Sequence, residues 1–142
     1  MEDWLFYALI AAVCFGVNTV IYKIAVQKGN LSPYYGGFVF GIGIFLLLLF
    51  FFFMKPSLEF EWKSSLLLIL AGIIWAIGFV AIALAISKGA DVARLAPIFN
   101  TNTIIAVLLS ILVLKEIPDI SQIFRIIAGS VLIVVGAILV SI

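Results

Sequence analysis

Long apolar runs alternate with short polar segments along the whole chain. Five runs are long enough, at about 20 residues each, to cross the hydrocarbon core of a bilayer as helices. They cover roughly residues 4–25, 34–54, 64–87, 92–114 and 118–140. The pattern predicts an all-α integral membrane protein whose five transmembrane helices form a bundle.

The breaks between the runs contain residues that end or begin helices. Gly29 and Pro33 separate the first two runs, Gly89 and Asp91 separate the third from the fourth, and Pro118 falls in the first turn of the fifth. Because these connections are short, consecutive helices should be antiparallel neighbours. We expect a single membrane domain over residues 1–142, with no connecting segment long enough for a soluble domain.

Composition agrees with this interpretation and excludes several functions. Hydrophobic residues make up 66% of the 142 residues and charged residues 11%, with a mean hydropathy of +1.39. The net charge of +1 predicts no nucleic-acid partner. The absence of His and the single Cys14 disfavour metal sites and His-based catalysis. We therefore expect neither an enzyme nor a cofactor.

The cations of the loops are evenly divided between the two predicted sides of the membrane. One side holds Lys23, Lys28, Lys88 and Arg94, and the other holds Lys55, Lys63, Lys115 and Arg125. Positive charges in short loops decide orientation, so this count favours neither. The even count can be a chance property of short loops, or it can mean that the same chain inserts in both orientations. In the second case two antiparallel chains would form a ten-helix assembly with an inverted repeat and a site near the midplane.

The most polar stretch inside an apolar run is the sequence NTNT, residues 100–103, near the centre of the fourth run. Lipid offers such side chains no hydrogen bonds, so they should face protein or a water-filled cavity. Helical phase places Pro97, Asn100 and Thr101 on one face and Asn102 and Thr103 elsewhere. We predict that Asn100 and Thr101 face a substrate pathway and that the other two bond a neighbouring helix. Alternatively, all four join helices, at about 0.6 kcal/mol each.

Pro97 removes a backbone hydrogen bond and can kink the fourth helix, which would open backbone groups to a substrate. The other interpretation is a proline tolerated near a helix start without any function. We include Pro97 among the predicted substrate-binding residues.

The first and third runs add further candidates for substrate binding. Asn18 and Tyr22 are four residues apart and share a helix face, and Lys23 could bind an anionic group or extend to the membrane interface. Trp75 and Phe79, one turn apart in the middle of the third run, could wall a substrate site or pack in the core. Glycines crowd the second run from Gly36 to Gly43, which is typical of close helix packing or of a dimer surface.

The order and spacing of several motifs resemble the EamA domain of the drug/metabolite transporter superfamily. The first run contributes "FGVNTVIYK", with Phe15, Gly16, Asn18 and Lys23. The later motifs are Ala83-Leu84, Gly89-Ala90, Pro97, Glu116, and Gln122 with Gly129 and Gly136. The first run has acids only at its start, Glu2 and Asp3, which disfavours the related small multidrug exporters that use a mid-helix glutamate.

Most relatives carry two such domains in tandem, related by inversion. The resemblance therefore implies one inverted-repeat half of a ten-helix transporter, completed by a second copy or by a paralogous partner. We expect a transporter of small organic metabolites that works by alternating access, with helices three and four rocking around the site. The alternatives are a non-transporting scaffold, one half of a heteromeric assembly, and a flippase for lipids or lipid-linked sugars.

Overall fold

The computed structural model describes residues 3–54, 61–116 and 119–141, and every regular element in them is helical. The elements are α1 (Asp3–Gly29), α2 (Pro33–Met54), α3 (Trp62–Ser87), α4 (Val92–Phe99), α5 (Asn102–Leu109), the π-helical η1 (Ser110–Leu114) and α6 (Ile120–Ser141). Five spans are long and apolar enough to cross a membrane, with α4, α5 and η1 together making the fourth. The predicted all-α membrane fold is confirmed, while Pro118 lies outside the described residues.

In the part of the chain that the structure describes, residues with a positive φ follow three of the helices, and one of these residues is Lys115, with a φ of 56° after η1. Gly89 has a φ of 92° and follows Lys88, the C-cap residue of α3, as its place in the sequence predicts. At the end of α1 the left-handed residue is Asn30, with a φ of 48°, and Gly29 is the last helical residue. Asparagine tolerates this region better than most residues, so α1 includes Gly29 and ends four residues after residue 25, the predicted end of the run.

Glu61 caps the start of α3, which begins at Trp62, two residues before the predicted run. Its carboxylate accepts hydrogen bonds from the backbone N–H groups of Ser64, at 2.6 Å, and Lys63, at 3.2 Å. The side-chain hydrogen bond from Ser64, followed by these backbone bonds, lowers the pKa of Glu61 below its ordinary value. An ionised cap at this end also suits the positive end of the helix dipole.

The chain divides into two compact units. One consists of Met1–Thr19 and Ala90–Ile142 and is called here the α4–α6 unit; the other, Val20–Gly89, is the α2–α3 unit. Helix α1 contributes its first part to the α4–α6 unit and its last part to the α2–α3 unit.

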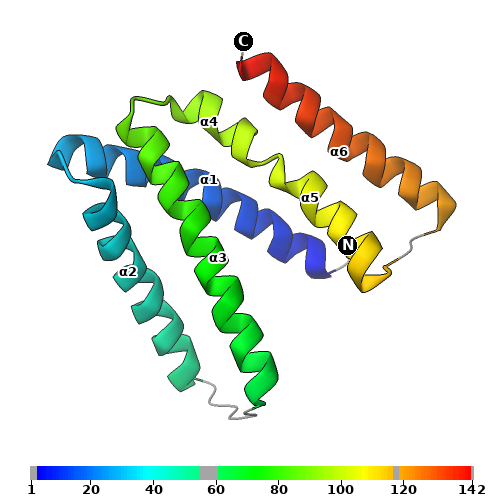
Figure 1. Ribbon diagram of the computed structural model, residues 1–142, viewed down its shortest axis with the longest axis horizontal. Coiled ribbons are helices and arrows are strands. Elements are labelled where there is room, and N and C mark those ends of the chain that lie inside the picture. The colour runs from blue at the N-terminus through cyan, green and yellow to red at the C-terminus, as the bar shows by residue number, and fades with distance from the viewer. Residues whose placement is uncertain (1–2, 55–60, 117–118, 142) are drawn as a thin grey trace. The chain divides into compact units, whose positions relative to one another are not determined.

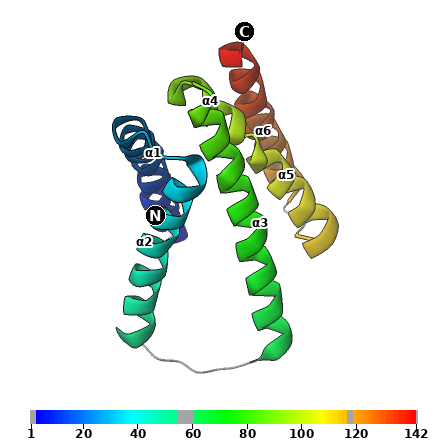
Figure 2. The same ribbon diagram turned by 60° about the vertical axis from the view of Figure 1, so that its left-hand side comes forward.

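In the α2–α3 unit, the start of α2 packs against the end of α1 and against α3 (Figure 1). The two helices of the hairpin diverge toward Met54 and Trp62 (Figure 2). The packed end depends on small residues, because a Cβ at Gly36 would lie 3.1 Å from both the Tyr22 hydroxyl and a Val26 methyl. Close packing, one of the two predicted roles, is thus shown at Gly36, whereas a Cβ at Gly41 or Gly43 would meet nothing within 4 Å.

In the α4–α6 unit, α4 and α5 follow one another alongside α6 in both views (Figures 1 and 2). Arg94 of α4 joins the helices at one end. Its Nε donates to the Val140 carbonyl at 3.1 Å and its Nη2 to the Ser141 carbonyl at 3.0 Å. These are last-turn carbonyls of α6, where a cation is favoured by the helix dipole.

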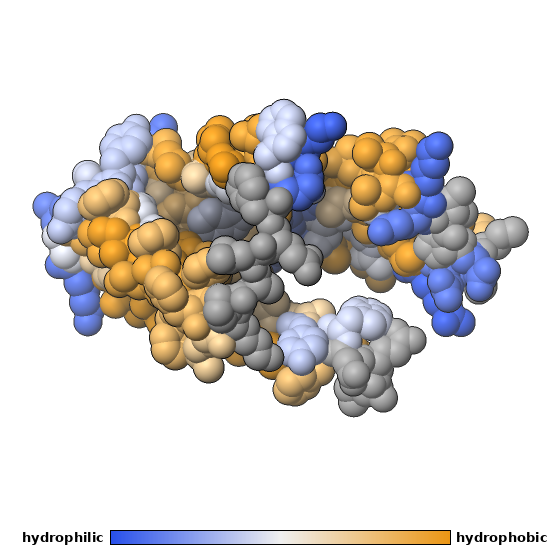
Figure 3. All heavy atoms as spheres, turned by 90° about the horizontal axis from the view of Figure 1, so that it is seen from below, coloured by the Kyte–Doolittle hydropathy of each residue, from blue (hydrophilic) through white to orange (hydrophobic). Residues whose placement is uncertain are grey.

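Apolar side chains cover most of the surface seen in Figure 3, and hydrophilic residues occur there in small groups. Along α2, for example, Phe53 is 70% exposed and Leu48 is 61% exposed. Soluble proteins rarely expose apolar surface on this scale, whereas lipid tails cover it without penalty.

Candidate functional site

The fourth membrane span is interrupted near its middle. Helix α4 ends at Phe99 and α5 begins at Asn102, with Asn100 and Thr101 forming a turn between them. Across this turn the backbone N–H groups bond to carbonyls three residues back, for example Thr101 to Ile98 at 3.2 Å and Thr103 to Asn100 at 3.2 Å. Such bonds belong to a tighter 3₁₀ geometry. The prediction of one continuous helix over 92–114 is therefore wrong at these two residues.

Threonine hydroxyls support the interruption. Thr101 Oγ1 donates to the Ile98 carbonyl at 2.8 Å, and Thr103 Oγ1 donates to the Asn100 carbonyl at 2.9 Å. Ser, Thr and Asn side chains compete with helical backbone bonds in this way, and Pro97 has already removed one backbone N–H from the preceding turn. The polar residues of the fourth span thus stabilise an irregular backbone at membrane depth.

This geometry also corrects which residues share a face. The Thr103 hydroxyl bonds within its own span, so the prediction that it bonds a neighbouring helix is wrong. Residues three apart are nearly eclipsed in a 3₁₀ turn, which brings Thr103 onto the same side as Asn100. Residues three apart also lie on the same side of a regular α-helix, so the prediction that separates Thr103 from Asn100 is wrong for either geometry.

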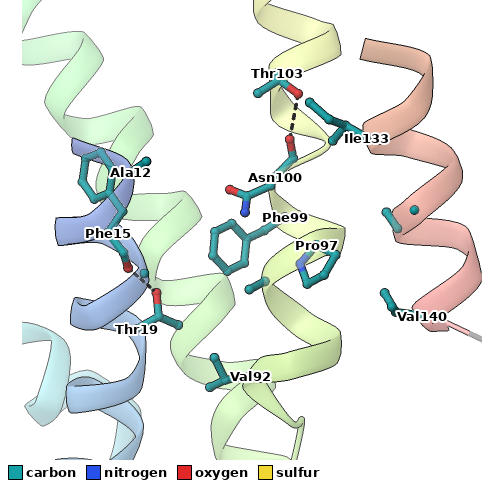
Figure 4. A pocket seen from close by; sticks show the side chains of 14 residues that line it. Ala12, Phe15, Thr19, Val92, Pro97, Phe99, Asn100, Thr103, Ile133 and Val140 are labelled. Carbon is teal, nitrogen blue, oxygen red and sulfur yellow. Dashed lines mark hydrogen bonds between the residues drawn. The ribbon is translucent and has the colours of Figure 1, made fainter. Parts of the chain in front are cut away.

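A pocket with a volume of about 700 Å³ lies beside the interruption, within the α4–α6 unit (Figure 4). This volume is in the range of small-molecule sites. Three groups of residues line it: Ala12, Phe15, Gly16 and Thr19 from α1; Val92, Ala96, Pro97, Phe99, Asn100 and Thr103 from the fourth span; and Ile133, Gly136, Ala137 and Val140 from α6.

The polar groups of the pocket come from α1 and from the interruption. The Asn100 amide and the Phe99 ring point from the fourth span toward α1, where Phe15 and Thr19 lie (Figure 4). The Asn100 side chain is exposed and makes no hydrogen bond to the residues that the structure describes. Thr19 Oγ1 donates to the Phe15 carbonyl at 2.8 Å. None of the lining residues is ionisable.

Two of the predicted site residues, Asn100 and Pro97, line this pocket. Thr101 belongs to the interruption but not to the lining, and Asn18, half-buried on α1, is also outside it. Whether any of these residues binds a substrate stays a prediction.

Three other predicted site residues form an aromatic cluster in the α2–α3 unit. Phe79 is at its centre: its ring stacks on Phe40 at 4.5 Å and on Trp75 at 5.5 Å, and meets the edge of Tyr22 at 5.0 Å. Tyr22 is 7% exposed, and its hydroxyl donates to the Pro33 carbonyl at 3.4 Å. Lys23, the remaining candidate, is half-buried in the same unit. The candidates are therefore divided between the two units.

Sequence reasoning left out several residues that line the pocket, above all Thr103, Thr19, Phe15 and Phe99. Ala12, Phe15 and Thr19 follow helical spacing on one face of α1, a signal that was present in the sequence. Thr103 lies three residues after Asn100, and residues at this spacing share one side of a helix, so this signal was present in the sequence as well.

Five apolar spans and a pocket beside a broken span define a multi-pass integral membrane protein with a fold suited to transport. Comparison with protein families matches residues 3–142 to the EamA-like transporter family. The chain belongs to this family, and its function is that of a membrane transporter. No curated protein and no solved structure matches the chain.

Proposed function

We propose that the protein carries small organic metabolites across the membrane by alternating access, as an antiparallel homodimer. The observation that carries the proposal is the interrupted fourth span beside the pocket. In lipid, irregular backbone is tolerated where it is buried in protein or lines a cavity. Discontinuous helices at membrane depth are also where many secondary transporters hold their substrates.

The interruption supplies both a binding group and a place to bend. It presents the Asn100 amide to the pocket, and its short backbone bonds separate α4 from α5. Rocking of the third and fourth spans of each copy would then expose the site to one side of the membrane at a time. A hinge of this kind needs only a few residues that change their backbone angles.

The antiparallel arrangement is supported by the loop cations, four on each side of the membrane. With no orientation favoured by charge, the chain can insert both ways, and a twin in the opposite orientation supplies the inverted half. Residues 3–142 match the EamA-like transporter family, and the resemblance to tandem-domain relatives implies that a domain of this kind is one such half.

Orientation can be tested with single cysteines. Cys14 is first replaced by Ala; Gln27→Cys then marks one side, and Glu116→Cys marks the other. A membrane-impermeant maleimide should label about half of each variant in intact cells, with permeabilised cells giving the total. Labelling of only one variant would show a single orientation, which contradicts the antiparallel homodimer and favours a paralogous partner.

Transport itself is tested with the purified chain in proteoliposomes. We expect time-dependent uptake of a bound metabolite, abolished when Asn100 is replaced by Leu. A folded chain that binds the metabolite but never moves it would contradict transport by one chain and favour the heteromeric or scaffold alternative.

A further inference from the structure

We infer that the pocket beside the interruption binds an uncharged ligand with a flat apolar body and at least one N–H or O–H donor. The inference rests on the proposed function, because it names the chemical class of the cargo. The charge of the lining, its hydrogen-bonding groups and its aromatic rings all point to this class.

The lining carries no formal charge. None of its side chains is ionisable, and the Arg94 guanidinium on the same helix as Pro97 is bonded to the carbonyls of Val140 and Ser141. A charged ligand would lose its hydration here without gaining a countercharge, which is costly in an apolar site at membrane depth. A neutral ligand has no such penalty.

The hydrogen-bonding groups of the lining accept more than they donate. A hydroxyl has one proton and two lone pairs. Thr19 and Thr103 each donate that proton to a backbone carbonyl, so toward the pocket they offer lone pairs only. The Asn100 amide adds one acceptor oxygen and its N–H donors. A ligand with N–H or O–H groups can satisfy these acceptors, whereas one that only accepts is limited to the Asn100 N–H groups.

Two aromatic rings supply the apolar walls. Phe15 and Phe99 line the pocket, and among the described residues neither ring pairs with another aromatic side chain. Their faces and edges are thus available to a ligand, and rings of this kind favour offset or edge contacts with another flat π-system. The remaining lining is mostly aliphatic, which excludes a ligand that is polar all round.

The test uses four naphthalene compounds of similar shape with the purified chain in nanodiscs. They are 2-naphthamide, neutral with N–H donors; methyl 2-naphthoate, neutral without donors; 2-naphthoate, an anion; and 2-naphthamidine, a cation at neutral pH. The dissociation constant of each is measured by equilibrium binding. We expect 2-naphthamide to bind about tenfold more tightly than the other three, the difference that one or two hydrogen bonds or an uncompensated charge produces.

Two asparagines two residues apart give a matched pair of variants. Asn100→Leu should weaken 2-naphthamide binding about tenfold. Asn102→Leu removes the same group from an exposed position outside the lining. Its dissociation constant for 2-naphthamide should stay within about twofold of that of the parent. The thermal unfolding midpoints of both variants establish that the comparison is made on folded protein, and Thr103→Val provides a second change in the lining.

The outcomes separate this inference from the proposed function. Tighter binding of the amidine or of the carboxylate, or binding of 2-naphthamide that depends on neither Asn100 nor Thr103, would overturn the assigned class. If 2-naphthamide binds in an Asn100-dependent way but is not taken up into proteoliposomes, the inferred ligand class is supported and the proposed transport is contradicted.

Discussion

The two units of the chain use polar and aromatic residues in opposite ways. In the α2–α3 unit, the rings of Tyr22, Phe40 and Trp75 surround Phe79, and the Tyr22 hydroxyl is bonded to a backbone carbonyl. In the α4–α6 unit, the Asn100 amide faces a pocket without a hydrogen bond to the described residues. A polar or aromatic residue in a membrane helix is therefore better judged by whether its bonding groups are already occupied than by its type.

This contrast predicts different consequences of substitution. Changes in the α2–α3 unit should lower stability, because they remove contacts that the protein makes with itself. Changes in the lining of the pocket should lower ligand affinity and leave stability nearly unchanged. The following variants test the contrast, beginning with the largest expected effect.

Phe79→Ala should cause the largest loss of stability. It removes the ring at the centre of the aromatic cluster, and a Phe-to-Ala change of this kind costs about 3 kcal/mol, at the lower end of the range because lipid can cover part of the gap. Unfolding in detergent micelles measures the loss. Phe38→Ala in the same unit is the control, since that ring is 67% exposed and its removal should have little effect. Equal losses for the two variants would show that the cluster does not hold the unit together.

Gly36→Leu should be the next most disruptive change. A Cβ alone would lie 3.1 Å from the Tyr22 hydroxyl and from a Val26 methyl, so a leucine must push the start of α2 away from α1. Overpacking of this kind costs about 2 kcal/mol. Gly43→Leu, on the same helix with open space around it, should be tolerated. The measurement is the unfolding midpoint of each variant. If Gly36→Leu leaves the midpoint as high as Gly43→Leu does, the start of α2 is not tightly packed on α1.

Sequence reasoning predicted the spans because a bilayer requires a minimum apolar length, and it predicted the end of α3 because Gly89 tolerates a positive φ. It did not predict which faces meet. Lipid tails are as apolar as leucine, so the hydropathy of α2 or α3 does not mark the side that packs on a neighbour. Hydropathy likewise does not indicate that Tyr22, predicted to bind substrate, is buried against Gly36.

The interruption was missed for a different physical reason. Pro97 suggested a kink, but the break falls at Asn100 and Thr101, where hydroxyl-to-carbonyl bonds compete with the helical pattern. These local bonds accompany backbone hydrogen bonds that reach three residues back instead of four, and α4 ends there. A pattern that assumes a constant 100° per residue cannot register such a change.

Thr103→Val and Thr101→Val give a smaller and more specific test of the pocket. Both hydroxyls donate to a carbonyl three residues back, at 2.9 Å and 2.8 Å, so both variants lose the same kind of internal bond. Only Thr103 belongs to the lining. We expect Thr103→Val to weaken binding of 2-naphthamide by about fivefold, and Thr101→Val to weaken it less. The reverse order would return Thr101 to the pathway, as helical phase alone predicts.

The smallest effect is expected at the start of α3, where Glu61 caps the helix. Hydrogen bonds from Ser64 and Lys63 lower the pKa of this carboxyl below its ordinary value of 4.5. A lowered pKa in the folded protein contributes stability that is fully present above the ordinary value and is lost as the pH falls through the lowered one. Glu61→Gln should therefore reduce the unfolding midpoint slightly at neutral pH, and the two proteins should converge in acid. If Glu61→Gln instead lowers the unfolding midpoint by the same amount at neutral and at acidic pH, the charge of the Glu61 carboxylate contributes nothing to stability. The loss would then come only from altered hydrogen-bond geometry, which does not depend on protonation.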